Sequence, residues 1–481
     1  MPKKEIRVRF APSPTGEMHI GNARNALYDF LFARQNKGKF FLRLEDTDRE
    51  RFVESSIKTT MDTLQWLGLD WDGEPVIQSE RLDLYGKHAK ELVEKDLAYY
   101  CFCSSERLEQ VRQEQMAKKL PPCYDRHCRD LEKGIVEEKL KSGEKYVIRL
   151  KVPLAGIVEY EDMIKGKISF DLKTVDDQVL QKSDGFPTYH LAHVVDDHEM
   201  KISHVIRSEE WISSTPKHLL LYQFFDWEMP IFAHLPMILG PDKSKLSKRH
   251  GATSVLEFRE QGYLPETLLN YVAFLGWNPG DEREIFSLKE LVKEFSMAKV
   301  HKAPAIFNHE KLDWLNGNYI RQKSAKELAE LCLPYFIKAG LIKEGEYDKK
   351  YLEQVVLLEQ GRMKKLSEIT ELTKFLFGDD LAYDANLLLW KKLTKEEVRK
   401  NLETAKDFIS QLKAKDFTKE KLEDKLKALI AEKGIGTGDM LWPLRVALTG
   451  QKASPGPFEV AAVLGQEKAL ARLERALAKL S

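Results

Sequence analysis

Residues 9–22 read RFAPSPTGEMHIGN, and they continue a run from residue 6 in which apolar and basic side chains alternate. The alternation over residues 6–10 predicts a short strand, and the prolines and glycine that follow predict a tight loop. From about residue 21, apolar side chains recur at helical spacing, and we expect this helix to extend to residue 36. A helix that begins just after a strand presents free backbone N–H groups and the positive end of its dipole, so this segment predicts an anion site.

Two residues at the start of the expected helix have the chemistry that an anion site needs. The imidazole of His19 can donate a hydrogen bond to a phosphate oxygen, and Gly21 lets a ligand approach the backbone closely. Taken alone, however, the His-x-Gly sequence is more simply explained as an ordinary strand–turn–helix with an incidental histidine. A second segment is needed to decide between these interpretations.

That second segment is PDKSKLSKRHG, residues 241–251, which follows apolar residues 236–240 at the expected end of a buried strand. A run of cations is usually a solvated loop. In an α/β sheet, however, ligands bind at the carboxyl ends of the strands. Lys245 and Lys248 could there hold a triphosphate as its charge shifts during displacement. Together, the two segments predict a site for a nucleoside triphosphate.

Both segments resemble the signatures of class I aminoacyl-tRNA synthetases, His-Ile-Gly-His and Lys-Met-Ser-Lys-Ser. Longer phrases resemble the bacterial-type glutamyl-tRNA synthetases in particular. These phrases are residues 10–16 (FAPSPTG), 43–48 (RLEDTD), 182–192 (KSDGFPTYHLA), 205–211 (VIRSEEW) and 443–450 (PLRVALTG). The resemblance therefore covers nearly the whole chain. The chain departs from the signatures at Asn22, Leu246 and Arg249, and the first departure leaves open the role of a second histidine.

The resemblance implies an α/β Rossmann-like catalytic domain with an inserted α+β acceptor-binding domain, followed by an all-α C-terminal anticodon-binding region. We expect the catalytic domain in residues 1–100 and 190–250, the insertion in 101–189, a helical stem-contact domain in 251–320 and the anticodon-binding region in 321–481. Strand and helix patterns alternate in the first hundred residues, which independently predicts a parallel sheet. The expected strands are residues 6–10, 40–44, 146–152, 157–160, 167–171, 204–207 and 231–239, and the expected helices include 21–36, 54–67, 81–96 and 215–226.

A substrate with two carboxylates and one ammonium, such as glutamate, needs guanidinium groups and at least one anion in its pocket. Arg9 and Arg207 both end expected strands, which predicts them at the carboxyl edge of the sheet, although a local salt bridge would also explain Arg207. Glu45 likewise fits a solvated turn. The resemblance assigns glutamate binding to Arg9, Ala11, Ser13, Glu45, Tyr189, His193 and Arg207.

The resemblance also implies the reaction. Glutamate would attack the α-phosphorus of ATP, with Mg²⁺ on the phosphates. A hydroxyl of the terminal ribose of tRNA(Glu) would then attack the glutamyl-adenylate. Relatives need bound tRNA even for the first step, and we expect the same here. The implied catalytic residues are His19, Lys245 and Lys248, and the implied ATP-binding residues are His19, Gly21, Asn22, Lys245, Ser247 and Lys248. Whether tRNA(Gln) is also charged stays open.

Three other classes of protein share parts of this pattern. A truncated relative that glutamylates a base of tRNA lacks the helical last third, which this chain has. A non-catalytic tRNA-binding paralogue would not need intact His19, Lys245 and Lys248. A free-standing nucleotidyltransferase would not need the helical residues beyond about 321.

Four of the five cysteines lie within residues 101–128. Two close pairs separated by an intervening stretch suit tetrahedral zinc, and free thiols are the alternative. Some glutamyl-tRNA synthetases carry a structural zinc ion in this region. The ligands that the resemblance implies are Cys101, Cys103, Tyr124 and Cys128, with His127 or Cys123 as alternative fourth ligands.

The helical last third resembles the anticodon-binding region of the same enzymes. Proteins read single-stranded RNA by splaying its bases apart, stacking on them and hydrogen-bonding to their edges. Surface arginines on helices are common, so a purely structural role for Arg362 and Arg445 stays open. The residues that the resemblance places at the anticodon are Arg362, Arg445, Ser454 and Pro455.

The composition sets limits on the class of protein. With 481 residues the chain is too long for one ordinary domain. Lys and Arg number 76, as do Asp and Glu, so the net charge of zero gives no hint of nucleic acid. The sequence has no apolar run of about eighteen residues, which would predict a membrane span, and no secretory signal. We therefore expect a cytoplasmic protein without a membrane partner and, from the resemblance, a monomer.

Overall fold

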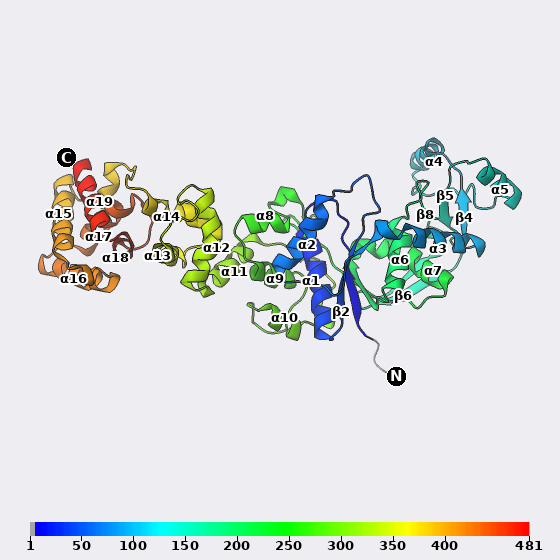
Figure 1. Cartoon of the computed structure of the whole chain (residues 1–481), viewed down its shortest axis with the longest axis horizontal. Coiled ribbons are helices and arrows are strands. Elements are labelled where there is room, and N and C mark those ends of the chain that lie inside the picture. Colours follow the sequence, from blue (N-terminus) through cyan, green and yellow to red (C-terminus); the bar gives the residue numbers. More distant parts are fainter. Residues whose placement is uncertain (1–4, 481) are drawn as a thin grey trace. The chain divides into compact units, whose positions relative to one another are not determined.

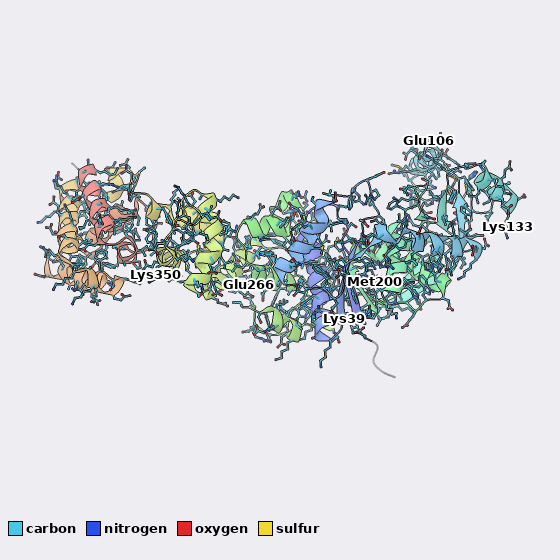
Figure 2. The ribbon with its side chains drawn as sticks, in the orientation of Figure 1. Lys39, Glu106, Lys133, Met200, Glu266 and Lys350 are labelled. Atoms are coloured by element: carbon cyan, nitrogen blue, oxygen red, sulfur yellow. The ribbon has the colours of Figure 1, made fainter. Side chains whose placement is uncertain are left out.

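The computed structural model describes residues 5–480. Contacts divide the chain into two compact units, Met1–Arg259 with Pro265–His309, and Glu260–Leu264 with Glu310–Ser481. Figure 1 shows the order of helices and strands along the chain, and Figure 2 adds the side chains that pack between them. Across residues 5–480, every helix is too short or too polar to span a bilayer.

A parallel sheet lies at the centre of the first unit. β1 (Arg7–Phe10) pairs with β2 (Lys39–Leu44), and β2 pairs with the short β3 (Val76–Ile77). α1 (Ile20–Gln35) connects β1 to β2 and contacts both strands with buried apolar side chains. The expected strand–loop–helix at the start of the chain is therefore present, with ends that differ from the expected ones by one residue.

A second parallel pair lies beside the first. β9 (His204–Ser208) pairs with β10 (Ile231–Leu235) over five residues. The N–H of Ser203 donates to the carbonyl oxygen of Arg7 at 2.9 Å, so β9 and β1 are neighbours. The carboxyl ends of β1 and β9 therefore meet at one edge, which is where ligands bind in such sheets. The connecting helices are α2 (Ser55–Leu67), α3 (Leu82–Glu94), α6 (Tyr189–Glu199) and α7 (Thr215–Phe225).

An antiparallel hairpin extends this sheet beyond β10. β6 (Ile157–Asp162) pairs with β7 (Gly166–Asp171), as the sequence predicts. β6 also pairs in parallel with β10, where Asp162 stands opposite Phe232. The hairpin thus joins the sheet of the nucleotide fold, although its residues lie within the stretch expected as an insertion. The alternation pattern shows which face of a strand is buried but not which strand lies beside it.

A separate antiparallel sheet is formed by β4 (Ala98–Cys101), β5 (Val147–Leu150) and β8 (Val179–Gln181). Two helices, α4 (Ser105–Ala117) and α5 (Lys133–Lys141), lie between β4 and β5 in the sequence. The cysteine cluster lies in this part of the first unit, beginning at the end of β4.

The single strand expected over residues 231–239 is wrong. β10 ends at Leu235, and Pro236 follows it without an N–H for a ladder hydrogen bond. The chain then forms β11 (Ile238–Leu239), which pairs with β12 (Ala305–Ile306) in a different, two-stranded sheet. The break turns the basic loop that follows β11 toward the start of α1.

Two further helices of the first unit, α9 (Pro265–Ala273) and α10 (Leu288–Glu294), pack against α1. The hydroxyl of Tyr28 on α1 donates to the carbonyl of Ala273 at 2.9 Å. A buried aromatic core, which includes Trp277, Phe286 and Phe295, lies in the same region. The short helix α8 (Val255–Glu260) precedes α9 in the chain.

The second unit is helical, as expected for residues 321–481. The buried guanidinium of Arg472 donates to the carbonyls of Phe375, Gly378 and Leu448, so it supplies donors to backbone groups near two helix ends. The helices are α11 (His309–Gln322), α12 (Ala325–Lys338), α13 (Lys349–Glu359), α14 (Ile369–Phe377), α15 (Lys395–Gln411), α16 (Lys419–Glu432), α17 (Thr437–Thr449), α18 (Pro457–Leu464) and α19 (Gln466–Lys479).

Candidate active site

The imidazole of His19 lies at the N-terminus of α1 and caps the helix. Its Nδ1 atom accepts the backbone N–H of Gly21 at 3.0 Å. Burial, and then the ammonium of Lys245, lower the pKa of His19 below its usual value. A neutral imidazole that accepts at Nδ1 carries its proton on Nε2. His19 can therefore donate this N–H to an anion beside the start of α1.

A cavity of about 460 Å³ opens beside His19, and we call it the nucleotide cavity. It is lined by all six residues that are expected to bind ATP, three from the start of α1 and three from the basic loop. The tertiary structure thus joins two segments that are distant in sequence. Its other lining residues include Arg24, Asn25, Ser208, Glu210, Met237 and Thr253.

The basic loop is held in shape by Asp242. This carboxylate accepts hydrogen bonds from Ser244 and His250, which keep its pKa far below the usual value. Arg249 pairs with the same carboxylate at 3.1 Å. Part of the positive charge of the loop is therefore balanced from within, a compensation that sequence reasoning missed.

The two lysines expected to hold phosphate have different surroundings. Lys245 forms an ion pair with Glu210, which follows β9. Among the residues that the structure describes, Lys248 has no carboxylate within ion-pair distance. Both ammonium groups belong to the lining of the nucleotide cavity. A triphosphate there would meet Lys248 directly and would compete with Glu210 for Lys245.

A second cavity of about 210 Å³ adjoins the first, and we call it the amino-acid cavity. Three residues, Asn22, Asn25 and Ser208, line both cavities, so ligands in the two would meet at a shared wall. Six of the seven residues predicted to bind glutamate line it: Arg9, Ala11, Ser13, Glu45, Tyr189 and Arg207.

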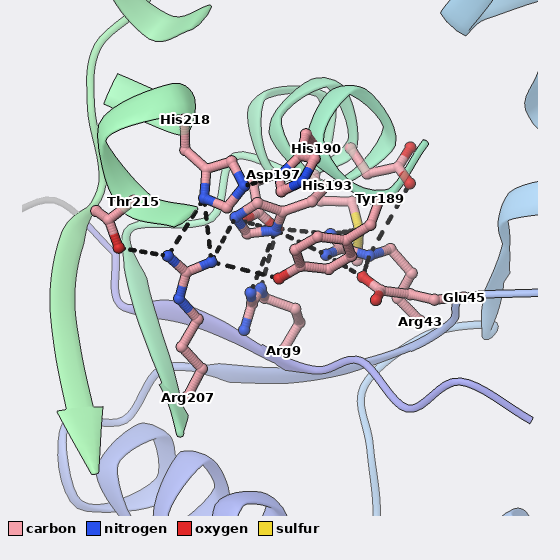
Figure 3. Close-up of polar contacts among 12 residues, drawn as sticks. Arg9, Arg43, Glu45, Tyr189, His190, His193, Asp197, Arg207, Thr215 and His218 are labelled. Atoms are coloured by element: carbon pink, nitrogen blue, oxygen red, sulfur yellow. Dashed lines mark hydrogen bonds and ion pairs between the residues drawn. The ribbon is translucent and has the colours of Figure 1, made fainter. Parts of the chain in front are cut away.

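Arg9, which lines this cavity, and the buried Arg43 share the carboxylate of Asp197 (Figure 3). Arg9 donates to Asp197 at 2.9 Å, and Arg43 donates to Asp197 at 2.5 Å and to Glu45 at 2.9 Å. Burial raises the pKa of Glu45, although Arg43 and Arg9 act in the opposite direction. The sequence phrase RLEDTD contains Arg43, but only the fold shows that it orients Glu45 and Asp197.

Arg207 has a different kind of environment. Among the described residues, no carboxylate lies within ion-pair distance of its guanidinium. Its contacts, at 3.0–3.3 Å, are the side chains of Tyr189, His193, Thr215, His218 and His234. Burial and then Arg207 lower the pKa values of His193 and His218 well below the usual one, so these imidazoles are neutral. Arg207 therefore keeps an uncompensated positive charge beside the amino-acid cavity.

His193, the seventh residue predicted for this pocket, lies behind the cavity wall. It is fully buried, with Nε2 at 3.3 Å from Arg207 and Nδ1 at 3.5 Å from Arg9. Its ring stacks on that of Tyr189 at a centroid distance of 5.2 Å. The structure thus places His193 between Arg9 and Arg207.

Two polar residues of α1 that sequence reasoning missed also face the amino-acid cavity. Asn25 and Asp29 lie one helical turn apart, and both line this cavity. The Oδ1 atom of each is buried without a hydrogen-bond partner. Burial raises the pKa of Asp29 well above its usual value, although Arg9 acts in the opposite direction. The helical pattern alone would have assigned both residues to a polar helix face.

The cysteine cluster brings together the ligand set that the resemblance implies. The Sγ atoms of Cys101, Cys103 and Cys128 all lie within 4.8 Å of one another. The hydroxyl of Tyr124 is 3.3 Å from Cys101 Sγ and 3.4 Å from Cys103 Sγ. Cys123 is exposed and bonds to the side chain of Gln115 instead. The three thiols are soft ligands that suit zinc, and the phenol oxygen would bring the ligand number to four.

The residues expected at the anticodon lie in the second unit. Arg362, in the turn after α13, pairs with the buried carboxylate of Glu359 at 2.8 Å. Arg445, on α17, lies over the ring of Trp442 and donates to the carbonyl of Lys452 at 3.0 Å. The turn that follows contains Ser454 and Pro455, where the hydroxyl of Ser454 donates to the carbonyl of Pro455 at 3.1 Å.

Comparison with known families agrees with both halves of this description. A family model for the catalytic domain of class I tRNA synthetases (E and Q) matches residues 5–314. A second, for an anticodon binding domain, matches residues 327–477. These matches confirm the Rossmann-like catalytic domain and the helical anticodon-binding region that the sequence predicts.

Relatives match along the full length of the chain. The glutamate–tRNA ligase of Dehalococcoides mccartyi (strain BAV1) is 49% identical, over 99% of this chain and 98% of the relative. Glutamate–tRNA ligase 1 of Caldanaerobacter subterraneus is 46% identical, over 98% of each. A crystal structure of a glutamate tRNA ligase from Elizabethkingia meningosepticum in complex with its amino acid has a TM-score of 0.90 and 37% identity, covering 99% of this chain and 100% of that one.

The chain therefore belongs to the class I tRNA synthetases of the E and Q type, in which its full-length relatives are glutamate–tRNA ligases.

Proposed function

We propose that the protein is a glutamate–tRNA ligase, which joins glutamate to AMP at the expense of ATP and then transfers it to the 3′-terminal ribose of tRNA(Glu). The single observation that carries this proposal is the pair of adjoining cavities. One holds His19 and the basic loop, the other holds an uncompensated arginine, and they share the wall of Asn22, Asn25 and Ser208.

The amino-acid cavity has the charges that glutamate requires. Within residues 5–480 the guanidinium of Arg207 has no carboxylate partner, and we assign it to the side-chain carboxylate of the substrate. Glu45 and Ser13 are assigned to the ammonium, and Arg9 to the α-carboxylate side. Such charge-assisted hydrogen bonds are stronger than neutral ones. Ala11 and Tyr189 complete the walls of the cavity, and Tyr189, together with His193 behind the wall, contacts Arg207.

The first step needs positioning and charge stabilisation more than proton transfer. The α-carboxylate attacks the α-phosphorus in line across the shared wall, and pyrophosphate leaves. The Nε2–H of His19 and the ammonium groups of Lys245 and Lys248 meet the charge that develops on the phosphates. Gly21, Asn22 and Ser247 complete the nucleotide cavity. Mg²⁺ bound with ATP would offset phosphate charge, and Glu210 is the carboxylate that lines this cavity.

The second unit supplies the selection of tRNA. We assign recognition of anticodon bases to Arg362, Arg445, Ser454 and Pro455. We expect bound tRNA to be required for the first step. tRNA(Glu) is the primary partner, and glutamylation of tRNA(Gln) is the alternative that the assay below separates.

We propose a structural zinc ion in the cysteine cluster. Cys101, Cys103 and Cys128 would provide thiolates, and Tyr124 the fourth ligand. The exposed positions of Cys123 and His127 argue against the alternative ligand sets. The ion would link the segment after β4 to the turn that contains Tyr124. Its ligands are distant in sequence from both ATP-binding segments, so its role would be structural.

Exchange of radioactive pyrophosphate into ATP tests the main proposal. The exchange should depend on glutamate and on tRNA(Glu), and glutamylation of purified tRNA(Glu) should follow. No glutamate-dependent exchange with tRNA present would overturn the proposal. Full exchange without tRNA would overturn only the tRNA requirement. A parallel assay with tRNA(Gln) decides whether both tRNAs are charged.

A further inference from the structure

Arg207 is held by a hydrogen-bonded series that leads from the amino-acid cavity into the hairpin of β6 and β7. We propose that His234 and Asp162 are positioning residues, which fix the guanidinium of Arg207 for the side-chain carboxylate of the substrate without neutralising it. The inference rests on the proposed function and deepens it, because it names residues outside the cavity that govern selection of glutamate.

The series is buried and continuous. The Nε of Arg207 donates to Nε2 of His234 at 3.1 Å, and Nδ1 of His234 lies 2.6 Å from Oδ2 of Asp162. All three side chains are at least nine-tenths buried. Each residue comes from a different strand of one sheet, namely β9, β10 and β6.

The hydrogen-bond roles in the series follow from chemistry. A guanidinium can only donate, so Nε2 of His234 must accept. The proton of the neutral imidazole is then on Nδ1 and is donated to Asp162. Burial, and then Arg207, lower the pKa of His234, even though Asp162 acts in the opposite direction. His234 therefore stays neutral and has one tautomer.

Asp162 is itself anchored by the backbone. Its Oδ1 accepts the N–H groups of Ile164 and Lys165 at 2.9 Å, in the turn of the hairpin, and Oδ2 accepts the N–H of His234 at 3.1 Å. Burial would raise the pKa of Asp162, but these hydrogen bonds and that of the His234 side chain lower it, so the carboxylate is ionised. This side chain also stands where β6 pairs with β10.

A comparison with Arg9 shows what this arrangement achieves. Arg9 pairs directly with the carboxylate of Asp197, which offsets its charge. Arg207 instead meets a neutral imidazole, and the nearest carboxylate of its series lies beyond that ring. A neutral acceptor fixes the direction of the guanidinium and leaves its charge for a ligand. The two N–H groups of Nη1 face three side-chain partners at 3.2–3.3 Å. A substrate carboxylate could therefore replace one of these partners as the acceptor.

The test begins with Asp162→Asn, which leaves the shape of the side chain nearly unchanged. In Asp162→Asn, the amide can donate to Nδ1 of His234, which moves the imidazole proton to Nε2, where it opposes Arg207. We expect the KM for glutamate to rise about tenfold or more, the usual effect of losing a charged hydrogen bond. The KM for ATP and kcat at saturating glutamate should change less than about threefold. Selectivity for glutamate over glutamine should fall, because the carboxylate would lose its partner.

His234→Gln is the rescue variant, since its Oε1 can accept from Arg207 near the position of Nε2, whereas His234→Leu removes the acceptor. We expect the glutamine variant to retain a near-normal KM and the leucine variant to resemble Asp162→Asn. Glu91→Gln is a matched control, because Glu91 partners His88 at 3.0 Å in the same unit but lines neither cavity.

A spectroscopic measurement keeps the inference testable even if the variants fail to fold. Nitrogen-15 NMR of selectively labelled wild-type protein should show His234 protonated on Nδ1 and unprotonated on Nε2 between pH 6 and 8. The opposite tautomer or a charged ring would overturn the inference, as would a folded Asp162→Asn enzyme with the wild-type KM for glutamate. Absence of glutamate activation by the wild-type enzyme would overturn the proposed function instead.

Discussion

The Nδ1 atom of His19 accepts the backbone N–H of Gly21, so one imidazole both caps α1 and directs its Nε2 proton toward the nucleotide cavity. Two variants separate these roles. In His19→Asn, the side-chain oxygen can still cap the helix, but the shorter side chain places no donor at the position of Nε2. In His19→Ala, both are lost.

We expect both His19 variants to slow glutamyl-adenylate formation by about 10²–10³-fold, since each removes a donor to the developing charge. Only the alanine variant should lose about 1 kcal/mol of stability, the usual value of a helix cap. Single-turnover adenylate formation and thermal unfolding measure the two effects. Wild-type rates in the asparagine variant would show that the cap is the whole role of His19.

Lys248→Ala should lower the rate of pyrophosphate exchange by about 10²-fold or more, because its ammonium lines the nucleotide cavity and, among the described residues, has no carboxylate within ion-pair distance. The KM for glutamate should stay unchanged. Lys243→Ala is the control, since Lys243 belongs to the same loop but does not line the cavity. Equal losses in the two variants would mean that the general charge of the loop, and not Lys248, is responsible.

Glu359 makes stability depend on pH. Burial raises the pKa of this carboxyl to about 7, although Arg362 acts in the opposite direction. The folded state therefore keeps this carboxyl protonated up to a higher pH than the unfolded state does. The contribution of Glu359 to the free energy of unfolding is complete below about pH 4.5 and is lost as pH rises through 7. Glu359→Gln should be more stable than wild type by about 1–3 kcal/mol at pH 8, with a smaller difference at pH 5. Melting temperatures measured across this range decide the sign.

Arg362→Ala should weaken selection of tRNA at one anticodon base. Loss of a base contact of this kind costs about 1–3 kcal/mol, so kcat/KM for tRNA(Glu) should fall while glutamate activation at saturating tRNA is retained. Arg399→Ala is the control, because Arg399 is an exposed arginine of α15 paired with Glu403. A loss that is the same for tRNAs with altered anticodons would assign Arg362 to backbone contact instead.

Removal of zinc should loosen the segment that contains Tyr124 without abolishing catalysis. We expect one zinc per chain in protein purified without chelator, and reduced occupancy in Cys128→Ser and Tyr124→Phe. Cys123→Ser should keep full occupancy, because Cys123 is exposed and lies outside the cluster. Elemental analysis measures the zinc occupancy. Absence of zinc from the wild-type protein would mean that the three cysteines of the cluster are free thiols.

Each of the two groups of candidate ATP-binding residues could be predicted because each is local in the sequence. His19, Gly21 and Asn22 belong to one strand–loop–helix, and Lys245, Ser247 and Lys248 to one loop, so short-range patterns contain their geometry. The helical character of the second unit follows from the same kind of pattern. The break at Pro236 was missed because two strands of different sheets follow each other with hardly a gap.

The sequence by itself determines the chemistry of the two signatures and the order of strand and helix around them, because backbone propensity and side-chain type act over a few residues. It does not determine the partners of Arg207. Asp162, His234 and Arg207 come from three strands whose neighbours are set by packing, and their protonation depends on a burial that exists only in the folded chain. The same holds for Asp29, which lines the amino-acid cavity, and for Arg43, which bonds to Asp197, because their positions follow from how α1 and β2 lie against the rest of the sheet.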